Sequence, residues 1–321
     1  MYHVLKAEDF NPKIIEELFK RALFFEKALE KKKRLKLFEG AIMCSLFYEE
    51  STRTRFSFET AMHRLGGEVI STESAGMFSS AAKGESLEHT IQVISGVANP
   101  AMKYADIIVL RHPEIGAAER AAKVSGVPII NAGDGAGEHP TQALLDLYTI
   151  NRFCKRLNNL SVGFVGDLAY GRTVRSLCKL LAQYPNNKLY FIAPEGLKIK
   201  EDIKNYLKEK EVHFEESKNL KEIIKELDFC YVTRVQKNHI QDPKLIEEYQ
   251  NSKDKFVISK EIYEISESRG TFFSHPMPID SKEQEIKPEV ENLPQVIFLR
   301  QAGFGVPVRM AILYEVWRNG K

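Results

Sequence analysis

The sequence is poor in cysteine, which limits how the fold could be held together. It contains four cysteines and no CxxC pair: Cys44, Cys154, Cys178 and Cys230. All four fall in segments that we predict to be strand or helix interiors. We therefore expect small, reduced core residues of a cytosolic protein and no disulfide framework.

The sequence also lacks an excess of charge and long apolar runs. Lys+Arg 46 against Asp+Glu 44 gives a formal net charge of +2, which argues against a general nucleic-acid or membrane-surface binder. No stretch approaches the roughly 18 apolar residues of a membrane span. The N-terminus has no basic start followed by an apolar run. We expect a cytoplasmic protein in which any affinity for anions comes from a few placed cations.

Two Gly-rich signatures of nucleotide binding are missing. No lysine-containing P-loop is present, which disfavours ATP or GTP. The segment 162–171 offers glycines after a predicted strand but no GxGxxG, so a dinucleotide-binding dehydrogenase fits poorly.

Predicted strands and helices alternate along the chain in two series. Short apolar runs indicate strands at 42–48, 107–110, 127–131, 161–165, 188–193 and 227–233. Helical periodicity follows most of them, as in the segment that begins at Asn11-Pro12. The pattern predicts an α/β protein with two doubly wound parallel-sheet domains. We expect a long loop at 71–86 and an exposed helix over 198–225.

The second series of strands sets the domain limits. We assign residues 1–147 to a first domain and residues 148–303 to a second. No strand of the second series follows the last helix, at about 308–317, so this helix can pack back on the first domain. We therefore add residues 304–321 to the first domain.

Cations and hydroxyl groups gather just after the predicted strands. Ligands of open α/β sheets bind beyond the carboxyl ends of the strands, so these positions are where a site should be sought. They hold Ser51-Thr52-Arg53-Thr54-Arg55, Arg111-His112, His139-Pro140-Thr141-Gln142, Arg172, Arg234-Val235-Gln236 and His275-Pro276. The first of these runs opens a helix, where backbone N–H groups, hydroxyls and a guanidinium can hold an anion.

The run at 51–55 with Phe58-Glu59 behind it resembles the carbamoyl-phosphate signature of the aspartate and ornithine carbamoyltransferases. The resemblance continues at 62–67, 83–85, 111–113, 131–135, 139–142, 144–147 and 275–278, and it covers essentially the whole chain. It implies transfer of a carbamoyl group from carbamoyl phosphate to the α-amine of L-aspartate, an early step of pyrimidine biosynthesis. It also implies that no cofactor and no metal take part.

The resemblance assigns roles to the first-domain residues. Ser51, Thr52, Arg53 and Thr54 would hold the phosphate. Thr54, Arg111 and His139 would stabilise charge on the carbonyl oxygen, and Gln142 would bind the carbamoyl NH2 group. His139 need not be a general base, since the departing phosphate can take the amine proton. Arg53, Thr54, Arg111 and His139 are the predicted catalytic residues.

The second-domain residues decide which amine is carbamoylated. Arg172, Arg234 and Gln236 suit the two carboxylates of aspartate, because guanidinium groups bind carboxylates with two hydrogen bonds. By resemblance, Pro276 and Met277 complete the aspartate site. An ornithine-type enzyme would need acidic or neutral groups for the side-chain ammonium.

Three further residues match family positions that act between subunits or between the two domains. Ser79 and Lys83 match loop residues that serve the neighbouring subunit's site, and Lys83 would touch both substrates. A homotrimer with shared active sites is therefore expected, while association with regulatory chains stays open. Glu49 matches a residue that links the two domains on closure by pairing with arginines.

Four positions depart from the family's pattern: Glu50, Asn238, His239 and Ile279. The last three lie on the amino-acid side, where they bear on aspartate affinity and domain closure. Two alternatives stay open. One is a transcarbamylase for another amino acid such as ornithine. The other is a non-catalytic paralogue that acts as a binding or regulatory subunit.

Overall fold

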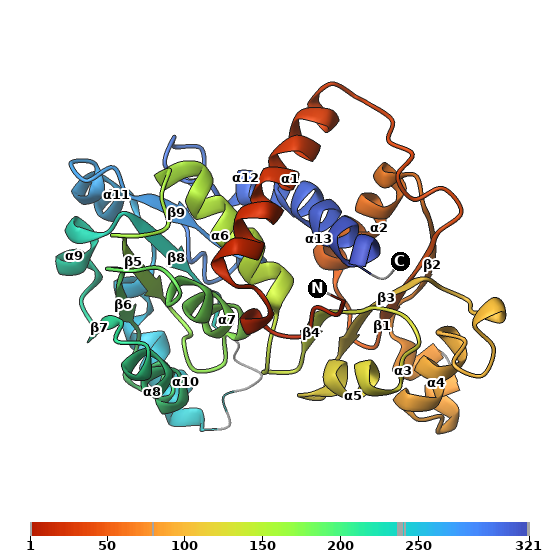
Figure 1. Cartoon of the computed structure of the whole chain (residues 1–321). Coiled ribbons are helices and arrows are strands. Elements are labelled where there is room, and N and C mark those ends of the chain that lie inside the picture. The colour runs from red at the N-terminus through yellow and green to blue at the C-terminus, as the bar shows by residue number, and fades with distance from the viewer. Residues whose placement is uncertain (1, 79, 236–239, 241, 320–321) are drawn as a thin grey trace. The chain divides into compact units, whose positions relative to one another are not determined.

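The computed structural model describes residues 2–78, 80–235, 240 and 242–319 and divides into two compact units (Figure 1). Unit 1 comprises Met1–Leu145 and Phe304–Lys321, and unit 2 comprises Asp146–Gly303. Each unit contains one parallel sheet with helices on both faces. The predicted fold class, two doubly wound α/β domains, is confirmed.

The sheet of unit 1 has the strand order β2-β1-β3-β4, with β1 (Ile42–Phe47), β2 (Glu68–Thr72), β3 (Ile107–His112) and β4 (Ile129–Asp134). Met43 of β1 lies opposite Val69 of β2 on one side and opposite Ile107 of β3 on the other. The strands β1, β3 and β4 are almost entirely buried. Sheets covered on both faces have such apolar strands, which is why the sequence predicted these three.

Helices cover both faces of this sheet (Figure 1). On one face, α3 (Ala75–Phe78), α4 (Leu87–Ile94) and α5 (Ala117–Val124) share a buried apolar cluster with the strands. On the other lie α1 (Pro12–Glu30), α2 (Thr52–Leu65) and α13 (Gly305–Asn319). The α1 helix begins as predicted, because the Asn11 side chain accepts a hydrogen bond from the Ile14 N–H (2.9 Å).

The C-terminal helix packs back on the first unit, as predicted. Arg21 Nε of α1 lies 3.3 Å from Glu315 Oε2 of α13. The ring of Trp317 stacks on Phe38, with 5.2 Å between the ring centroids. The helix is thus held by an ion pair and by aromatic packing.

The sheet of unit 2 has the order β7-β6-β5-β8-β9, and all its strand pairs are parallel. Its strands are β5 (Ser161–Val165), β6 (Lys188–Ile192), β7 (His213–Ser217), β8 (Phe229–Val232) and β9 (Phe272–Ser274). Its helices are α7 (Arg172–Leu181), α8 (Glu201–Glu209), α9 (Leu220–Ile223), α10 (Pro243–Ser252), α11 (Lys260–Ser266) and α12 (Phe298–Gly303). The helix α6 (Pro140–Cys154) begins in unit 1 and continues into unit 2. Among the helices of the described residues, none has the length and apolarity needed to cross a membrane.

Three strands, β2, β7 and the three-residue β9, have no counterpart among the predicted strands. The segment 71–86 was expected to be a loop, but it holds the end of β2, α3 and the 3-10 helix η2 (Ser80–Lys83). The exposed helix expected over 198–225 is wrong in part, because β7 lies between α8 and α9. β2 and β7 each form an edge of their sheet and consist of exposed and half-buried residues. They therefore lack the apolar runs that indicated the inner strands.

The four cysteines are free thiols. Cys44, Cys178 and Cys230 are buried, and Cys154 is half-buried. Burial raises the pKa of Cys44 to about 12 and, together with the nearby Asp228, that of Cys154 to about 12. Burial also raises the pKa of the Cys178 and Cys230 thiols strongly. The thiolate, which is the reactive form, is therefore scarce near neutral pH.

We predict that the native protein reacts very slowly with a thiol-specific disulfide reagent at pH 8. A pKa of about 12 leaves a thiolate fraction on the order of 10⁻⁴ at that pH for Cys44 and Cys154. Four thiols should react once guanidinium unfolds the chain. Cys154→Ser is the informative control, because this residue is the least buried. A fast-reacting thiol in the native protein would contradict the prediction, and its loss in that variant would assign it.

Candidate active site

The strand order of unit 1 reverses once, next to β1. The chain adds β2 on one side of β1 and then β3 on the other side. The connections that leave the carboxyl ends of β1 and β3 run in opposite directions, and open α/β sheets bind ligands at such a point. Glu49 and Ser51 follow β1, and Arg111 and His112 end β3. The Tyr48 N–H donates to the Arg111 carbonyl oxygen (2.9 Å), which ties the two strand ends together.

The first turn of α2 carries the residues predicted to bind phosphate. Ser51 occupies the N-cap position, but its side chain makes no capping hydrogen bond within the described part of the chain. The N–H groups at the helix start, with the positive end of the helix dipole, can therefore receive an anion. Thr52 and Arg53 are exposed, whereas Thr54 is buried. The helix start thus offers both accessible and buried donors.

Thr54 and His139 come together from distant parts of the sequence. Thr54 Oγ1 lies 3.5 Å from His139 Nε2, and both side chains are buried. His139 immediately precedes α6, and the Gln142 N–H in the first turn of α6 donates to the His139 carbonyl oxygen (3.1 Å). Arg111 lies on the adjacent strand, where its Nη1 donates to the Ala132 carbonyl oxygen (3.4 Å). The structure therefore places four predicted site residues at the carboxyl ends of the unit 1 strands: Thr54, Arg111, His139 and Gln142.

Glu49 contacts an arginine of its own unit. Its Oε2 lies 3.4 Å from Arg111 Nε. The pair holds the guanidinium at the end of β3 while leaving both side chains partly accessible. The role of Glu49 in domain closure stays a prediction.

Asp134 shapes the turn that leads to His139, and sequence reasoning assigned it no role. Its Oδ1 accepts from the Glu138 N–H (2.7 Å) and its Oδ2 from the Gly116 N–H (2.8 Å). The Gly137 N–H donates to the Asp134 carbonyl oxygen (2.8 Å). One buried carboxylate thus fixes the turn before His139 and the start of α5. Its signals in the sequence are its place between two glycines and within the family-like segment 131–135.

The arginine that ends the motif at 51–55 is structural. Arg55 Nη1 lies 2.6 Å from Glu73 Oε2, and its Nε lies 3.4 Å from Glu59 Oε1. The pair with Glu59 lies within α2, and the pair with Glu73 ties α2 to the segment that leads to η2. Lys83 ends η2 and is exposed. Ser79, the other predicted residue of this segment, lies outside the described residues.

Unit 2 repeats the reversal, with β5 between β6 and β8. Thr233 at the end of β8 donates its hydroxyl to the carbonyl oxygens of Val165 (3.1 Å) and Asp167 (3.2 Å). Gly166 has φ +112°, and a Cβ there would lie 2.4 Å from the Thr233 carbonyl oxygen. Glycine is therefore required where the two strand ends meet.

The predicted aspartate-binding arginines lie at these strand ends. Arg172 begins α7 and is half-buried, and Arg234 follows β8 and is exposed. Backbone hydrogen bonds lower the pKa of Asp280, and the Arg234 charge contributes to the shift. Burial raises the pKa of Glu285, and the same guanidinium opposes this rise. Arg234 thus lies within electrostatic reach of two carboxylates. Gln236, Asn238 and His239 lie outside the described residues.

Pro276 and Met277 belong to a turn that follows β9. The Met277 N–H donates to the Nδ1 atom of the buried His275 (2.8 Å). Met277 has φ +61°, a left-handed conformation that is unusual for a residue with a side chain. Ile279 packs against the apolar core of the unit. This contact explains why an apolar residue is suited to position 279, where the sequence departs from the family's pattern.

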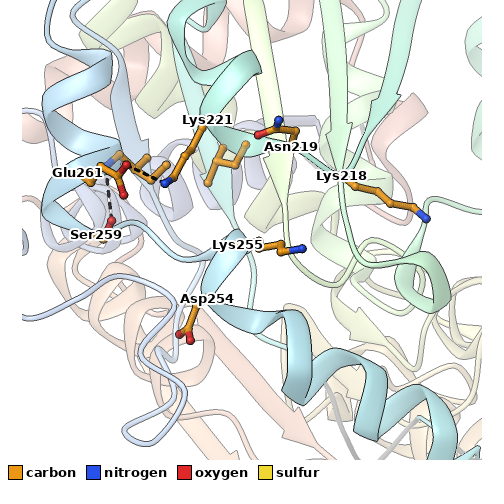
Figure 2. A pocket seen from close by; sticks show the side chains of 9 residues that line it. Lys218, Asn219, Lys221, Asp254, Lys255, Ser259 and Glu261 are labelled. Atoms are coloured by element: carbon orange, nitrogen blue, oxygen red, sulfur yellow. Dashed lines mark hydrogen bonds and ion pairs between the residues drawn. The ribbon is translucent and has the colours of Figure 1, made fainter.

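A pocket of about 580 Å³ lies elsewhere on unit 2 (Figure 2). It is lined by Lys218, Asn219, Leu220, Lys221, Asp254, Lys255, Ser259, Glu261 and Ile262. Lys221 Nζ points to Glu261 Oε1 at 2.7 Å, and Lys218 pairs with Glu195. None of the predicted site residues lines it. Two of its three lysines are neutralised by glutamates, so it is a weaker candidate than the strand ends.

No group of three or more His, Cys, Asp or Glu side chains that could hold a metal ion occurs among the described residues. His112, beside Arg111, has its pKa lowered by burial, and its ring lies 4.6 Å from that of Tyr48. A neutral imidazole is favoured there at pH 7. His112 therefore adds no positive charge to that of the neighbouring Arg111.

Two family models match the chain. The aspartate/ornithine carbamoyltransferase carbamoyl-P binding domain matches residues 2–152, and the aspartate/ornithine carbamoyltransferase Asp/Orn binding domain matches residues 158–316.

Curated and solved relatives agree with these matches. The chain is 47% identical to chloroplastic aspartate carbamoyltransferase 2 of Pisum sativum, over 97% of this chain and 77% of the relative. It is 47% identical to the aspartate carbamoyltransferase catalytic subunit of Methanocaldococcus jannaschii, over 98% of each. A solved M. jannaschii catalytic subunit has a TM-score of 0.88 at 46% identity, covering 99% of both chains. Trypanosoma cruzi aspartate transcarbamoylase in complex with carbamoyl phosphate and aspartate has a TM-score of 0.88 at 33% identity, covering 98% of this chain and 95% of that chain.

We predict that Asp134→Asn destabilises the protein by about 1–3 kcal/mol. An asparagine presents one acceptor oxygen, so one of the two N–H groups bound by Asp134 loses its partner. The free energy of unfolding in urea measures the loss. Glu119→Gln, an exposed change on the neighbouring α5, is the matched control and should leave stability within about 0.5 kcal/mol. Equal stability of the two variants would contradict the role given to Asp134.

Proposed function

This chain belongs to the aspartate/ornithine carbamoyltransferase family, and we infer that it is an enzyme that carbamoylates L-aspartate. It transfers the carbamoyl group of carbamoyl phosphate to the α-amine, which yields N-carbamoyl-L-aspartate and phosphate, an early step of de novo pyrimidine biosynthesis. One observation carries the inference. The family's motif residues, mostly cations and hydroxyls, lie where the strand order reverses in each unit.

In unit 1, the start of α2 is proposed to hold the phosphate. Ser51, Thr52, Arg53 and Thr54 supply hydroxyls, a guanidinium and first-turn N–H groups, which together suit a phosphate dianion. Gln142 is proposed to bind the carbamoyl NH2 group. The related T. cruzi enzyme has been solved with carbamoyl phosphate bound, which supports this substrate.

The proposed chemistry is a direct transfer. The amine nitrogen attacks the carbonyl carbon, a C–N bond forms, and the bond from that carbon to the bridging phosphate oxygen breaks. The oxygen keeps the electron pair, and the phosphate takes the proton that the amine gives up. Negative charge grows on the carbonyl oxygen during attack, and Thr54, Arg111 and His139 are proposed to stabilise it. Rate acceleration then comes from positioning and electrostatics.

In unit 2, Arg172 and Arg234 are proposed to bind the two aspartate carboxylates, with Gln236 as a third partner. Lys83, Pro276 and Met277 are proposed to complete this site. The T. cruzi relative solved with carbamoyl phosphate and aspartate supports a dicarboxylate acceptor. The two carboxylates within electrostatic reach of Arg234, Asp280 and Glu285, are themselves bound by backbone N–H groups. Asp280 Oδ1 accepts from the Lys282 N–H (2.8 Å), and Glu285 Oε2 accepts from the Asp280 N–H (2.9 Å). Both carboxylates near Arg234 thus accept hydrogen bonds from backbone N–H groups of the segment 280–282.

A homotrimer with shared sites is proposed from the segment around Lys83. Lys83 is exposed at the end of η2, a placement from which it can reach another subunit. Val93, Val97, Met102 and Tyr104, just after this segment, are 48% to 70% exposed. Clustered apolar residues at a surface are typical of subunit contacts. Cytoplasmic localisation and regulatory chains stay predictions.

Substrate choice is tested with the purified protein, carbamoyl phosphate and either L-aspartate or L-ornithine, without added metal. We expect N-carbamoyl-L-aspartate and no citrulline. Arg234→Ala should raise the KM for aspartate roughly 10- to 100-fold, because a charged hydrogen-bond partner is lost. The same variant should bind a phosphonate analogue of carbamoyl phosphate normally. Turnover with neither amine, with the analogue still bound, would instead support a binding-only paralogue.

Shared sites are tested by mixing two inactive variants. Lys83→Ala and His139→Ala should each lower kcat by roughly 10²-fold or more. If Lys83 serves a neighbouring subunit, trimers reassembled from both variants contain sites in which both residues are intact, and activity should return to a fraction of that of the unchanged protein. Reassembly of either variant with itself is the control. No recovery in mixed trimers would place Lys83 in the site of its own subunit.

A further inference from the structure

A buried polar network in unit 2 is centred on a residue that has no role assigned above. Its centre is Asp146 on α6, which has no exposed surface. Asp146 Oδ2 accepts from the Tyr231 hydroxyl (2.7 Å), and Oδ1 accepts from Gln301 Nε2 (2.7 Å). These partners come from β8 and α12, so one carboxylate joins three elements of the unit.

The network continues to the turn that holds Pro276 and Met277. Gln301 Oε1 accepts from the His275 N–H (3.0 Å), and His275 Nδ1 accepts from the Met277 N–H (2.8 Å). Gln301 and His275 are 2% and 1% exposed. An unbroken series of hydrogen bonds therefore runs from Asp146 to the backbone of Met277.

The carboxylate decides which way the Gln301 amide points. Its NH2 group faces Asp146, an acceptor, so its oxygen must face the His275 N–H, a donor. Because Gln301 is deeply buried, turning its amide the other way would leave polar groups unpaired. Each unpaired buried polar group costs about 1–3 kcal/mol. Met277 also needs external support, because its left-handed backbone costs on the order of 1–2 kcal/mol.

We propose that Asp146 and Gln301 are positioning residues that hold the turn at 275–278 in the conformation that binds the amino-acid substrate. This inference rests on the proposed carbamoylation of aspartate, in which Pro276 and Met277 contact that substrate. Asp146 and Gln301 do not touch the reacting atoms. Their effect should therefore fall on the KM for aspartate far more than on carbamoyl-phosphate binding.

The network can be broken and rebuilt by exchanging the two polar groups. Gln301→Glu places two carboxylates in contact and removes the donor to Asp146. Adding Asp146→Asn restores the bond between positions 146 and 301 with its polarity reversed: the asparagine NH2 donates to the glutamate, while the asparagine oxygen still accepts from the Tyr231 hydroxyl. The glutamate oxygen can still accept from the His275 N–H.

We expect Gln301→Glu to raise the KM for aspartate about tenfold or more, with the dissociation constant of a phosphonate analogue of carbamoyl phosphate unchanged. The double variant should recover most of that loss. Thr271→Val is the stability control. It removes a buried hydroxyl that donates to the Leu227 carbonyl oxygen (2.7 Å) at the other end of β9, and it should lower stability without changing the KM for aspartate.

Each result has a distinct meaning. An unchanged KM in Gln301→Glu, or no recovery in the double variant, overturns the positioning role. Equal KM increases in Gln301→Glu and Thr271→Val would overturn it too, since loss of stability alone would then explain the defect. Absence of aspartate turnover in the unchanged protein would refute the proposed function instead, so the two failures are separable.

Discussion

Parallel pairing of β1 with β3 and of β5 with β8 is the constraint on which the rest of the structure depends. Parallel strands need helical connections that cover both faces, so the interiors of these strands must be apolar. Polar chemistry is then left to the strand ends, and the strand order reverses beside β1 and beside β5. This arrangement accounts for the positions of the predicted site residues at the strand ends. They are Ser51 and Arg111 in unit 1, and Arg172 and Arg234 in unit 2.

The same constraint explains how much could be predicted from the sequence. The inner strands carry continuous apolar runs, so residues 161–165 were placed as the structure has them. Candidate residues such as Thr54 and His139 were found because the end of a strand can be recognised from the local sequence. The family resemblance then connected these residues to a reaction. Their contact across 85 residues of sequence comes only from the fold.

What escaped prediction has a common physical origin. The edge strands β2 and β7 are half-exposed, so their residues resemble those of loops and surface helices. Asp146 and Gln301 are 155 residues apart, and no periodicity marks a carboxylate whose partner lies on a distant helix. Asp134 likewise binds backbone N–H groups. Nearly every residue type has such a group, so the sequence does not show which ones Asp134 binds. Edges and buried polar networks depend on tertiary contacts that a linear pattern does not contain.

The electrostatic design combines a nearly neutral chain with strongly local charge. Arg55 is paired with Glu59 and Glu73, Arg111 has Glu49 beside it, and Arg234 lies near carboxylates. A guanidinium held by a carboxylate loses part of its long-range field but gains a fixed orientation. Recognition of small anions then depends on geometry at short range rather than on attraction from afar. The same holds for the backbone next to the site: the buried Asp134 carboxylate binds the N–H groups of Glu138 and Gly116 and so fixes the turn that leads to His139.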